Sequence, residues 1–324
     1  MTMCRFATAT VAAFILILTG CGKDASEGRR VIAVIPKGTT HEFWKSIHAG
    51  ALQAAAESGV EIAWKGPPKE DDRDEQIKVV EDSVTRRVSA IVLAPLDETA
   101  LAASVAEAAK DGVPTVVIDS DLKGASHSSF VATDNEKGGM MGAERLGSIL
   151  GGKGRVLLLR YQVGSASTEK RERGFLAGIA KYEGIRVVSD NQYAGATAEM
   201  AYAKAEDLLQ KFPDIDGIFC PNESATFGML RALTSVGRNG KVKFVGFDSS
   251  TKLAEGLRNG DIHGLVLQNP FRMGYLGVKT AVDVLDKKPV PARIDTGVMI
   301  ATQENMNTPV ITELLSPKLP PTVR

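Results

Sequence analysis

The stretch Val31-Ile-Ala-Val-Ile-Pro-Lys-Gly-Thr-Thr-His-Glu-Phe-Trp-Lys-Ser-Ile-His-Ala-Gly50 joins a short apolar run to a helix-like segment. Its first five residues are apolar with no polar alternation, which is typical of a strand buried on both faces of a parallel sheet. The segment Phe43–Ser58 that follows has the longer period of a helix. A strand that leads through a short loop into a helix is the repeating unit of an α/β sheet.

The same unit recurs along the chain. Further apolar runs are Ala90-Ile-Val-Leu-Ala94, Thr115-Val-Val-Ile118, Arg155-Val-Leu-Leu-Leu159, Gly217-Ile-Phe-Cys220, Lys243-Phe-Val-Gly246 and Gly264-Leu-Val-Leu267. Between them lie helix-like segments, among them Asp74–Arg86, Thr99–Asp111, Ala198–Lys211 and Ser224–Val236. Roughly 290 residues in this rhythm exceed what one hydrophobic core usually serves. We therefore expect an α/β protein with two doubly wound parallel-sheet lobes.

The N-terminus has the features of an export signal. Arg5 precedes an apolar run over residues 11–18, which is shorter than the ~20 residues of a membrane-spanning helix. The following Leu18-Thr-Gly-Cys21 resembles the lipobox of bacterial lipoproteins, in which the cysteine is acylated. We predict a signal peptide over 1–20 and a lipid-anchored tether over 21–30, so that the protein is exported and faces the periplasm or the cell exterior. The alternative is a plain signal peptide or a short anchor in which Cys21 occurs by chance.

Composition agrees with an exported protein. The chain has 39 basic and 39 acidic residues, and loss of residues 1–20 with Arg5 leaves 38 against 39, a net charge of −1. This balance gives no electrostatic basis for binding nucleic acid. Of the three cysteines, Cys4 leaves with the signal and Cys21 would be acylated, so no intramolecular disulfide is expected. Cys220 ends an apolar run and is predicted to be a buried, inert thiol.

Polar and aromatic residues gather where the predicted strands end. In doubly wound sheets the ligand binds beyond the carboxyl ends of the strands. A sugar has hydroxyls that suit carboxylates and amides, and C–H faces that suit an aromatic ring. The pattern predicts a polyol site with stacking by Phe43 or Trp44; the alternative is that one of the two packs in the core and the other is exposed by chance. The candidate residues are His41, Phe43, Trp44, Asp119, Ser120, Asn222, Asp248 and Gln268.

From about Val31 to Met299, the order and spacing of these motifs resemble the ribose-binding proteins and their relatives, the type I sugar-binding proteins of ABC importers. The matching motifs are His41-Glu-Phe-Trp-Lys-Ser-Ile-His-Ala-Gly50, Asp119, Thr133-Asp-Asn-Glu-Lys-Gly-Gly139, Arg171-Glu-Arg-Gly174, Asn222, Asp248 and Gln268. The resemblance assigns ligand contact in the basic motif to Arg173. It implies hinge closure on a monosaccharide or related polyol, an ABC permease as partner, no cofactor and no catalysis.

The resemblance also implies a type I periplasmic binding protein fold with three hinge crossings, near Thr133, Gln268 and Gly297. The lobes would then be 31–132 plus 269–296 and 133–268 plus 297–324. Two departures bear on the ligand: His41 stands where ribose binders have Asn, and Ser120 where they have Arg. The charges of Asp119, Asp248 and Arg173 would then sum to −1. This favours a sugar other than ribose, a polyol or an amino-bearing derivative.

Several other motifs resemble metal or phosphate sites but are interpreted as structural. His41 and His48 lie seven residues apart with no clustered carboxylate or cysteine, so no metal site is expected. Gly151-Gly-Lys-Gly154 precedes a strand, which is the wrong order for a phosphate loop. Glu70-Asp-Asp-Arg-Asp-Glu75 is predicted to open a helix, with its acids at the positive end of the dipole. Ser165, Ser167 and Thr168 are interpreted as polar groups of a loop.

Two other functions stay open at this point. The protein is a sensor if it presents its sugar to a membrane chemoreceptor instead of a permease. An exported α/β enzyme would need a nucleophile or a cofactor motif at a strand end, and the sequence has neither. A regulator of the lactose-repressor type is strongly disfavoured, because an export signal stands where that class has a basic DNA-binding segment. We expect a monomer.

Overall fold

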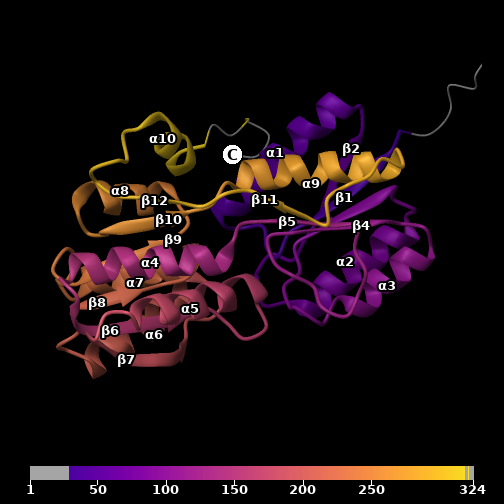
Figure 1. The fold of residues 1–324 in the computed structure, drawn as a ribbon. Coiled ribbons are helices and arrows are strands. Elements are labelled where there is room, and N and C mark those ends of the chain that lie inside the picture. The colour runs from indigo at the N-terminus through magenta and orange to yellow at the C-terminus, as the bar shows by residue number, and fades with distance from the viewer. Residues whose placement is uncertain (1–28, 318–319, 321–324) are drawn as a thin grey trace, which may run out of the picture.

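The computed structural model describes residues 29–317 and 320. They form two six-stranded sheets, with orders β11-β5-β4-β3-β1-β2 and β12-β10-β9-β8-β6-β7, which lie side by side in Figure 1. The first sheet contains β1 (Val31–Ile35), β2 (Glu61–Trp64), β3 (Ala90–Leu93), β4 (Thr115–Ile118), β5 (Ser129–Ala132) and β11 (Arg293–Asp295). The second contains β6 (Lys153–Arg160), β7 (Gly184–Tyr193), β8 (Gly217–Phe219), β9 (Lys243–Phe247), β10 (Gly264–Leu267) and β12 (Met299–Ala301).

The expected α/β class with parallel sheets is confirmed, with one difference at an edge. The apolar runs form the central strands, and β1, β3, β4 and β10 are buried along almost their whole length. The edge strand β12 instead pairs antiparallel with β10. The chain comes directly from the other sheet to reach this edge, with no crossover helix that would turn it parallel.

Helices cover both faces of each sheet. They are α1 (Glu42–Ser58), α2 (Arg73–Thr85), α3 (Ala102–Lys110), α4 (Asn135–Ile149), α5 (Ala166–Ile179), α6 (Ala198–Lys211), α7 (Glu223–Ser235), α8 (Thr251–Asn259), α9 (Pro270–Leu285) and α10 (Pro309–Leu315). Side chains of α1 and α9 form one apolar core with the first sheet, and those of α2 and α3 form another on its opposite face. No helix of the described part of the chain is long and apolar enough to span a membrane.

The chain passes between the sheets in three connections: β5 to α4, β10 to α9, and β11 to β12. Two of the connections touch, because the hydroxyls of Thr133 and Thr296 lie 3.3 Å apart. We call the first sheet with α1, α2, α3 and α9 the first lobe, and the second sheet with its helices the second lobe. In Figure 1 the late helix α9 lies alongside the early helix α1.

Two pairs of glycines bring the helices of each lobe into close contact. A Cβ on Gly50 of α1 would collide with the carbonyl of Phe271, and one on Gly274 of α9 would collide with that of Ile47. In the second lobe Gly139 of α4 and Gly174 of α5 form an equivalent pair. The glycines of the quoted motifs therefore allow backbones to approach closely. The second pair also fixes which face of α5 is buried.

Cys220 is fully buried and unpaired, and burial raises the pKa of its thiol. This agrees with the inert thiol expected from its apolar run. Cys21 and the rest of the predicted signal and anchor, up to residue 28, lie outside the described residues.

Candidate functional site: a polar cleft between the lobes

A cavity of about 30 Å³ lies between the carboxyl ends of the two sheets. Both lobes contribute to it, as expected for sheets whose strand ends face each other. From the first lobe it is lined by Lys37, His41, Phe43, Trp44, Glu70 and Asp119. From the second lobe and the connection that follows β10 it is lined by Tyr161, Ser167, Thr168, Arg171, Asn222, Glu223, Asp248 and Gln268.

Two aspartates occupy equivalent places in the two lobes. Asp119 directly follows β4 and Asp248 directly follows β9, and their side chains are almost fully buried. Both take the left-handed backbone conformation, with φ of 62° and 70°. A residue other than glycine held there costs about 1–3 kcal/mol, and such positions cluster at ligand sites. The turn aims each carboxylate out of its strand and into the cleft.

Arg171 of α5 lies between these carboxylates. Its Nη2 is 3.9 Å from Asp119 Oδ1, and its Nη1 is 3.7 Å from Asp248 Oδ2. Its Nε donates to Asn135 Oδ1 at 2.7 Å, and its guanidinium stacks on Phe247, 4.0 Å from the ring centre. Its buried Nη2 has no hydrogen-bond partner among the described residues. The guanidinium is thus rigidly held with one donor free for an oxygen acceptor.

The expectation that Arg173 faces the ligand is wrong, because its side chain lies outside the cleft. The side chain of Arg173 is 59% exposed and pairs with Glu136 at 2.7 Å on the outer surface. Two residues apart on a helix means about 200° around the axis, so Arg171 and Arg173 face opposite ways. Arg171 shares its face with Gly174 and Phe175, which pack toward α4. The first arginine of the motif, Arg171, is the one in the cleft.

Lys37 supplies a cation that the sequence interpretation overlooked. Its Nζ lies 2.9 Å from Asp119 Oδ2 and donates to Ser167 Oγ at 3.0 Å. It follows β1 by two residues and is 3% exposed. Ser120, which stands where ribose binders have arginine, accepts from the backbone N–H of Ser167 at 3.0 Å. The expected charge sum of −1 therefore omitted a lysine beside Asp119, while Ser120 joins the two lobes.

The acidic run opens a helix as expected, with Asp74 and Glu75 in the first turn of α2, but Glu70 at the start of the run reaches the cleft. Helix α2 begins at Arg73, and it is Asp72 that caps it by accepting from the Glu75 N–H at 2.9 Å. The buried carboxylate of Glu70 lies 2.6 Å from His41 Nδ1 and accepts from Trp44 Nε1 and Tyr161 Oη, each at 2.7 Å.

The two members of the Glu70–His41 pair shift each other's pKa. Burial alone would raise the pKa of Glu70, but the His41 and Lys37 cations and the hydrogen bonds lower it to about 2. Burial would lower the pKa of His41, but the carboxylates of Glu70, Glu223 and Asp248 raise it to about 9. His41 is therefore a cation at neutral pH.

Phe43 and Trp44 both line the cleft. Their rings meet edge to face, with centres 4.9 Å apart and planes at 86°. Trp44 is held by Glu70 and is only 2% exposed, whereas Phe43 is 8% exposed. The structure thus brings both candidates to the site, and each also packs in the core of the first lobe.

Asn222, Glu223 and Gln268 complete the wall from the second lobe. Asn222 caps α7, and its Oδ1 accepts from the Ala225 N–H at 3.2 Å. Gln268 Nε2 donates to Asp248 Oδ1 at 2.7 Å, and its buried Oε1 has no partner among the residues described. Glu223 accepts from the N–H groups of Glu42 and Phe43, and burial raises its pKa to about 7.

Most of the candidates from the sequence therefore meet in one place. His41, Phe43, Trp44, Asp119, Asn222, Asp248 and Gln268 line the cavity, and Ser120 lies beside it. Residues missed, or given another role, are Lys37, Glu70, Tyr161, Ser167, Thr168, Arg171 and Glu223. Tyr161 could have been found, because it follows β6 just as Asp119 follows β4. Within the described residues there is no cluster of three or more side chains that could hold a metal ion.

Comparisons with known proteins identify the family of the chain. The model of the periplasmic binding protein domain matches residues 32–289. The D-allose-binding periplasmic protein of Escherichia coli is 30% identical over 82% of this chain and 90% of its own. The ribose import binding protein of Bacillus subtilis is 28% identical over 90% of this chain and 96% of its own.

Solved structures give the same result. A carbohydrate transporter solute-binding protein from Agrobacterium radiobacter, in complex with D-arabinose, is 36% identical with a TM-score of 0.86, over 90% of this chain and all of that one. An ABC transporter solute-binding protein from Agrobacterium vitis with bound D-fucose is 33% identical with a TM-score of 0.85, over 88% of this chain and all of that one. The chain belongs to the periplasmic binding protein family, among the non-catalytic sugar-binding proteins that serve ABC transporters.

Proposed function

We propose that the cleft, whose volume of about 30 Å³ must widen as the lobes part, takes up a neutral monosaccharide or a related polyol, which the protein delivers to an ABC permease. The observation that carries the proposal is the set formed by Asp119, Arg171 and Asp248, with free hydrogen-bonding capacity at Arg171 Nη2 and Gln268 Oε1. Adjacent acceptors and a donor suit the vicinal hydroxyls of a sugar, each of which can donate and accept.

The charges lining the cleft favour a ligand without negative charge. The cations are Lys37, Arg171 and His41, and the acids are Glu70, Asp119, Asp248 and Glu223. Each cation already lies beside a carboxylate, so an anionic sugar would meet further acids and no unpaired cation. The relatives named above bind D-allose, ribose, D-arabinose and D-fucose, all of which are uncharged.

We propose further that the two lobes, 31–132 plus 269–296 and 133–268 plus 297–324, close on the ligand. Several contacts already cross the cleft, such as Tyr161 Oη to Glu70 Oε2 at 2.7 Å and Lys37 Nζ to Ser167 Oγ at 3.0 Å. A ligand that touches both lobes favours the closed state through its differential affinity. The motif Leu18-Thr-Gly-Cys21 supports a lipid anchor at Cys21.

The test is a thermal-shift and calorimetric screen of the exported domain against D-ribose, D-allose, D-arabinose, D-fucose, D-tagatose and xylitol. A ligand at ~100 times its Kd should stabilise the fold by ~2.7 kcal/mol. Asp119→Ala and Asp248→Ala should each weaken the best ligand by roughly ten- to a hundredfold, since hydrogen bonds to charged groups contribute ~1.5–3 kcal/mol. If both variants bind the ligand as tightly as the unmodified protein does, the site lies elsewhere. If none of these ligands raises the melting temperature, this ligand class is excluded.

A further inference from the structure

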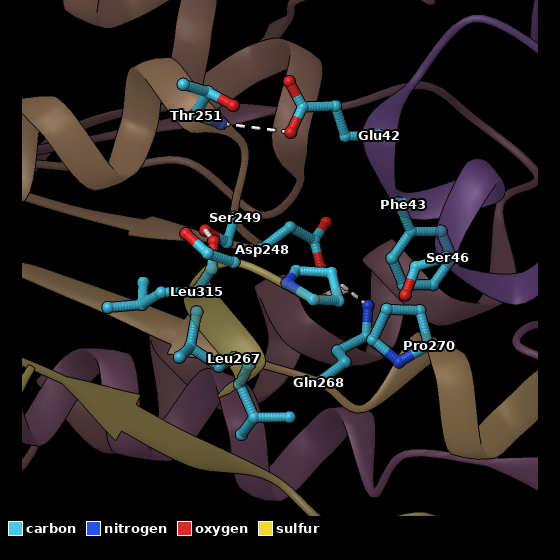
Figure 2. A pocket seen from close by; sticks show the side chains of 13 residues that line it. Glu42, Phe43, Ser46, Asp248, Ser249, Thr251, Leu267, Gln268, Pro270 and Leu315 are labelled. Atoms are coloured by element: carbon cyan, nitrogen blue, oxygen red, sulfur yellow. Dashed lines mark hydrogen bonds between the residues drawn. The ribbon is translucent and has the colours of Figure 1, made fainter. Parts of the chain in front are cut away.

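A second, larger cavity opens beside the cleft. Its volume is about 380 Å³, and Figure 2 shows the side chains around it. It shares Phe43, Asp248 and Gln268 with the lining of the cleft, so the two spaces meet at these three side chains. Its volume lies in the range of ~300–1,000 Å³ that small-molecule sites occupy.

Two of the residues that line this cavity each carry a buried polar atom without a partner in the described structure. Ser46 Oγ, on a side chain that is 1% exposed, makes no hydrogen bond within the described structure, and neither does Gln268 Oε1. The orientation of the Gln268 amide is fixed, because its Nε2 must be the atom that donates to Asp248. Leaving a buried polar atom unpaired costs about 1–3 kcal/mol. A hydroxylated group in the cavity could pair with Ser46 Oγ, and Gln268 Oε1, which has two lone pairs, could accept both from this group and from the sugar in the cleft.

The remaining walls define the chemistry further. Leu267, Pro270, Leu314 and Leu315 supply apolar surface, and Glu42 and Asp248 supply the only charges among the lining residues described. With two acids and no basic side chain, the cavity disfavours an anionic group. Polar atoms on one side and apolar carbon on another match a sugar ring, which has hydroxyls at its edge and C–H groups on its faces.

We propose that this cavity is a second subsite, which takes a neutral hydroxylated substituent carried by the sugar in the cleft. The substituent is a second sugar ring or the aglycone of a glycoside. Ser46 also lines a neighbouring groove of about 730 Å³ between α1, the start of α9 and α10, so a longer substituent has a way out. The proposal rests on the proposed function, because it requires the first sugar to occupy the cleft.

The test compares short and long ligands on the same protein by calorimetric titration. The monosaccharide that binds best in the screen above is compared with its methyl α- and β-glycosides and with disaccharides that end in it. Two variants place a larger side chain in the cavity. Ser46→Leu fills it from the buried wall on α1, and Thr251→Trp fills it from the exposed start of α8. Ser46→Ala removes only the hydroxyl that the proposal pairs with the substituent, so it should weaken the longer ligand, but less than Ser46→Leu does, and leave the monosaccharide unchanged.

At least one glycoside or disaccharide should bind the unmodified protein within tenfold of the monosaccharide or more tightly. Ser46→Leu and Thr251→Trp should each weaken this longer ligand by tenfold or more and change the monosaccharide by less than threefold. Since Thr251 is exposed, its variant still reports if Ser46→Leu does not fold. Binding of the monosaccharide alone, or equal losses for both ligands, would overturn the subsite and leave the proposed function intact. Binding of no sugar of either length would contradict both.

Discussion

Lys37 and Asp119 form a buried ion pair at the floor of the cleft, although they follow different strands of the first sheet. Lys37 Nζ is 2.9 Å from Asp119 Oδ2, and both side chains are 3% exposed. Ser165 and Ser167 of the second lobe accept further hydrogen bonds from the ammonium. The ion pair therefore neutralises a ligand-facing carboxylate and also links the two lobes.

Removing one member of this pair should destabilise the fold strongly. In Lys37→Met the Asp119 carboxylate stays buried, and the nearest remaining cation is Arg171 at 3.9 Å. The free energy of unfolding should therefore fall by about 3 kcal/mol. The matched control is Lys170→Met, which breaks a partly exposed pair with Asp121 of similar length, 2.8 Å, and should cost less than ~1 kcal/mol. Urea denaturation at neutral pH measures both. Equal losses in the two variants would mean that Asp119 finds other compensation.

The two arginines of the basic motif give a second contrast. Arg171→Met should weaken the best sugar by roughly ten- to a hundredfold, because it removes the free Nη2 donor of the guanidinium that lies between Asp119 and Asp248. Arg173→Met removes an exposed pair with Glu136 and should leave affinity within about twofold and stability within ~0.5 kcal/mol. Calorimetric titration beside melting curves of the unliganded variants separates the two effects. A loss of affinity in Arg173→Met alone would restore the original assignment.

The fold and about half of the site residues could be predicted from the sequence, because both follow from short local patterns. Asp119, Asn222, Asp248 and Gln268 come just after buried strands, and the strand-end rule needs no knowledge of how the lobes meet. Arg171 depends on the rotation of α5, which the Gly139–Gly174 contact sets. The pattern could have indicated it, because Gly174 and Phe175 follow Arg171 at the helical spacing.

Glu70 could not have been placed in this way. It lies in the loop between β2 and α2, and contacts with the other lobe hold that loop: Gln162 Nε2 donates to its carbonyl and Tyr161 Oη to its carboxylate. These partners are 92 and 91 residues away in the chain. No local period reports such contacts, so the acidic run indicated the start of α2 but not the separate position of Glu70 in the cleft.

The membrane anchor is a prediction from the sequence alone. If Cys21 is acylated, Cys21→Ser should move the protein from the membrane fraction to the soluble exported fraction, or leave it unprocessed. The control is Cys220→Ala, which changes a buried thiol far from any anchor and should leave the fractionation unchanged. Cell fractionation and mass spectrometry of the mature N-terminus are the measurements. A Cys21→Ser protein that stays with the membrane and is cut at the same bond would exclude lipidation.

The carboxylate of Glu223 should make ligand affinity depend on pH. In this structure it accepts from the Glu42 and Phe43 N–H groups at 3.2 and 3.0 Å. Burial raises its pKa to about 7; His41 lowers this pKa and the neighbouring Asp248 raises it further. Opening of the cleft would separate Glu223 from Phe43 and His41, which belong to the first lobe, and return it to water with a pKa nearer 4.5.

Between about pH 4.5 and 7, Glu223 should therefore be protonated in the closed state and deprotonated in the open state. Closure, and with it affinity, is strongest at the acidic end of this window and falls as pH rises toward 7. We expect a decrease of roughly tenfold for the best sugar between pH 5 and 7.5. Glu223→Gln, which resembles the protonated side chain, should flatten much of this slope and bind at pH 7.5 at least as tightly as the unmodified protein. Titrations at four pH values on both proteins test this.

The control is Glu172→Gln, in which the dependence of affinity on pH should persist. The pKa of Glu172 is also raised to about 7, but its partners Arg160 and Tyr161 lie in its own lobe. An affinity that rises with pH, or a slope unchanged by Glu223→Gln, would show that closure does not perturb this carboxyl.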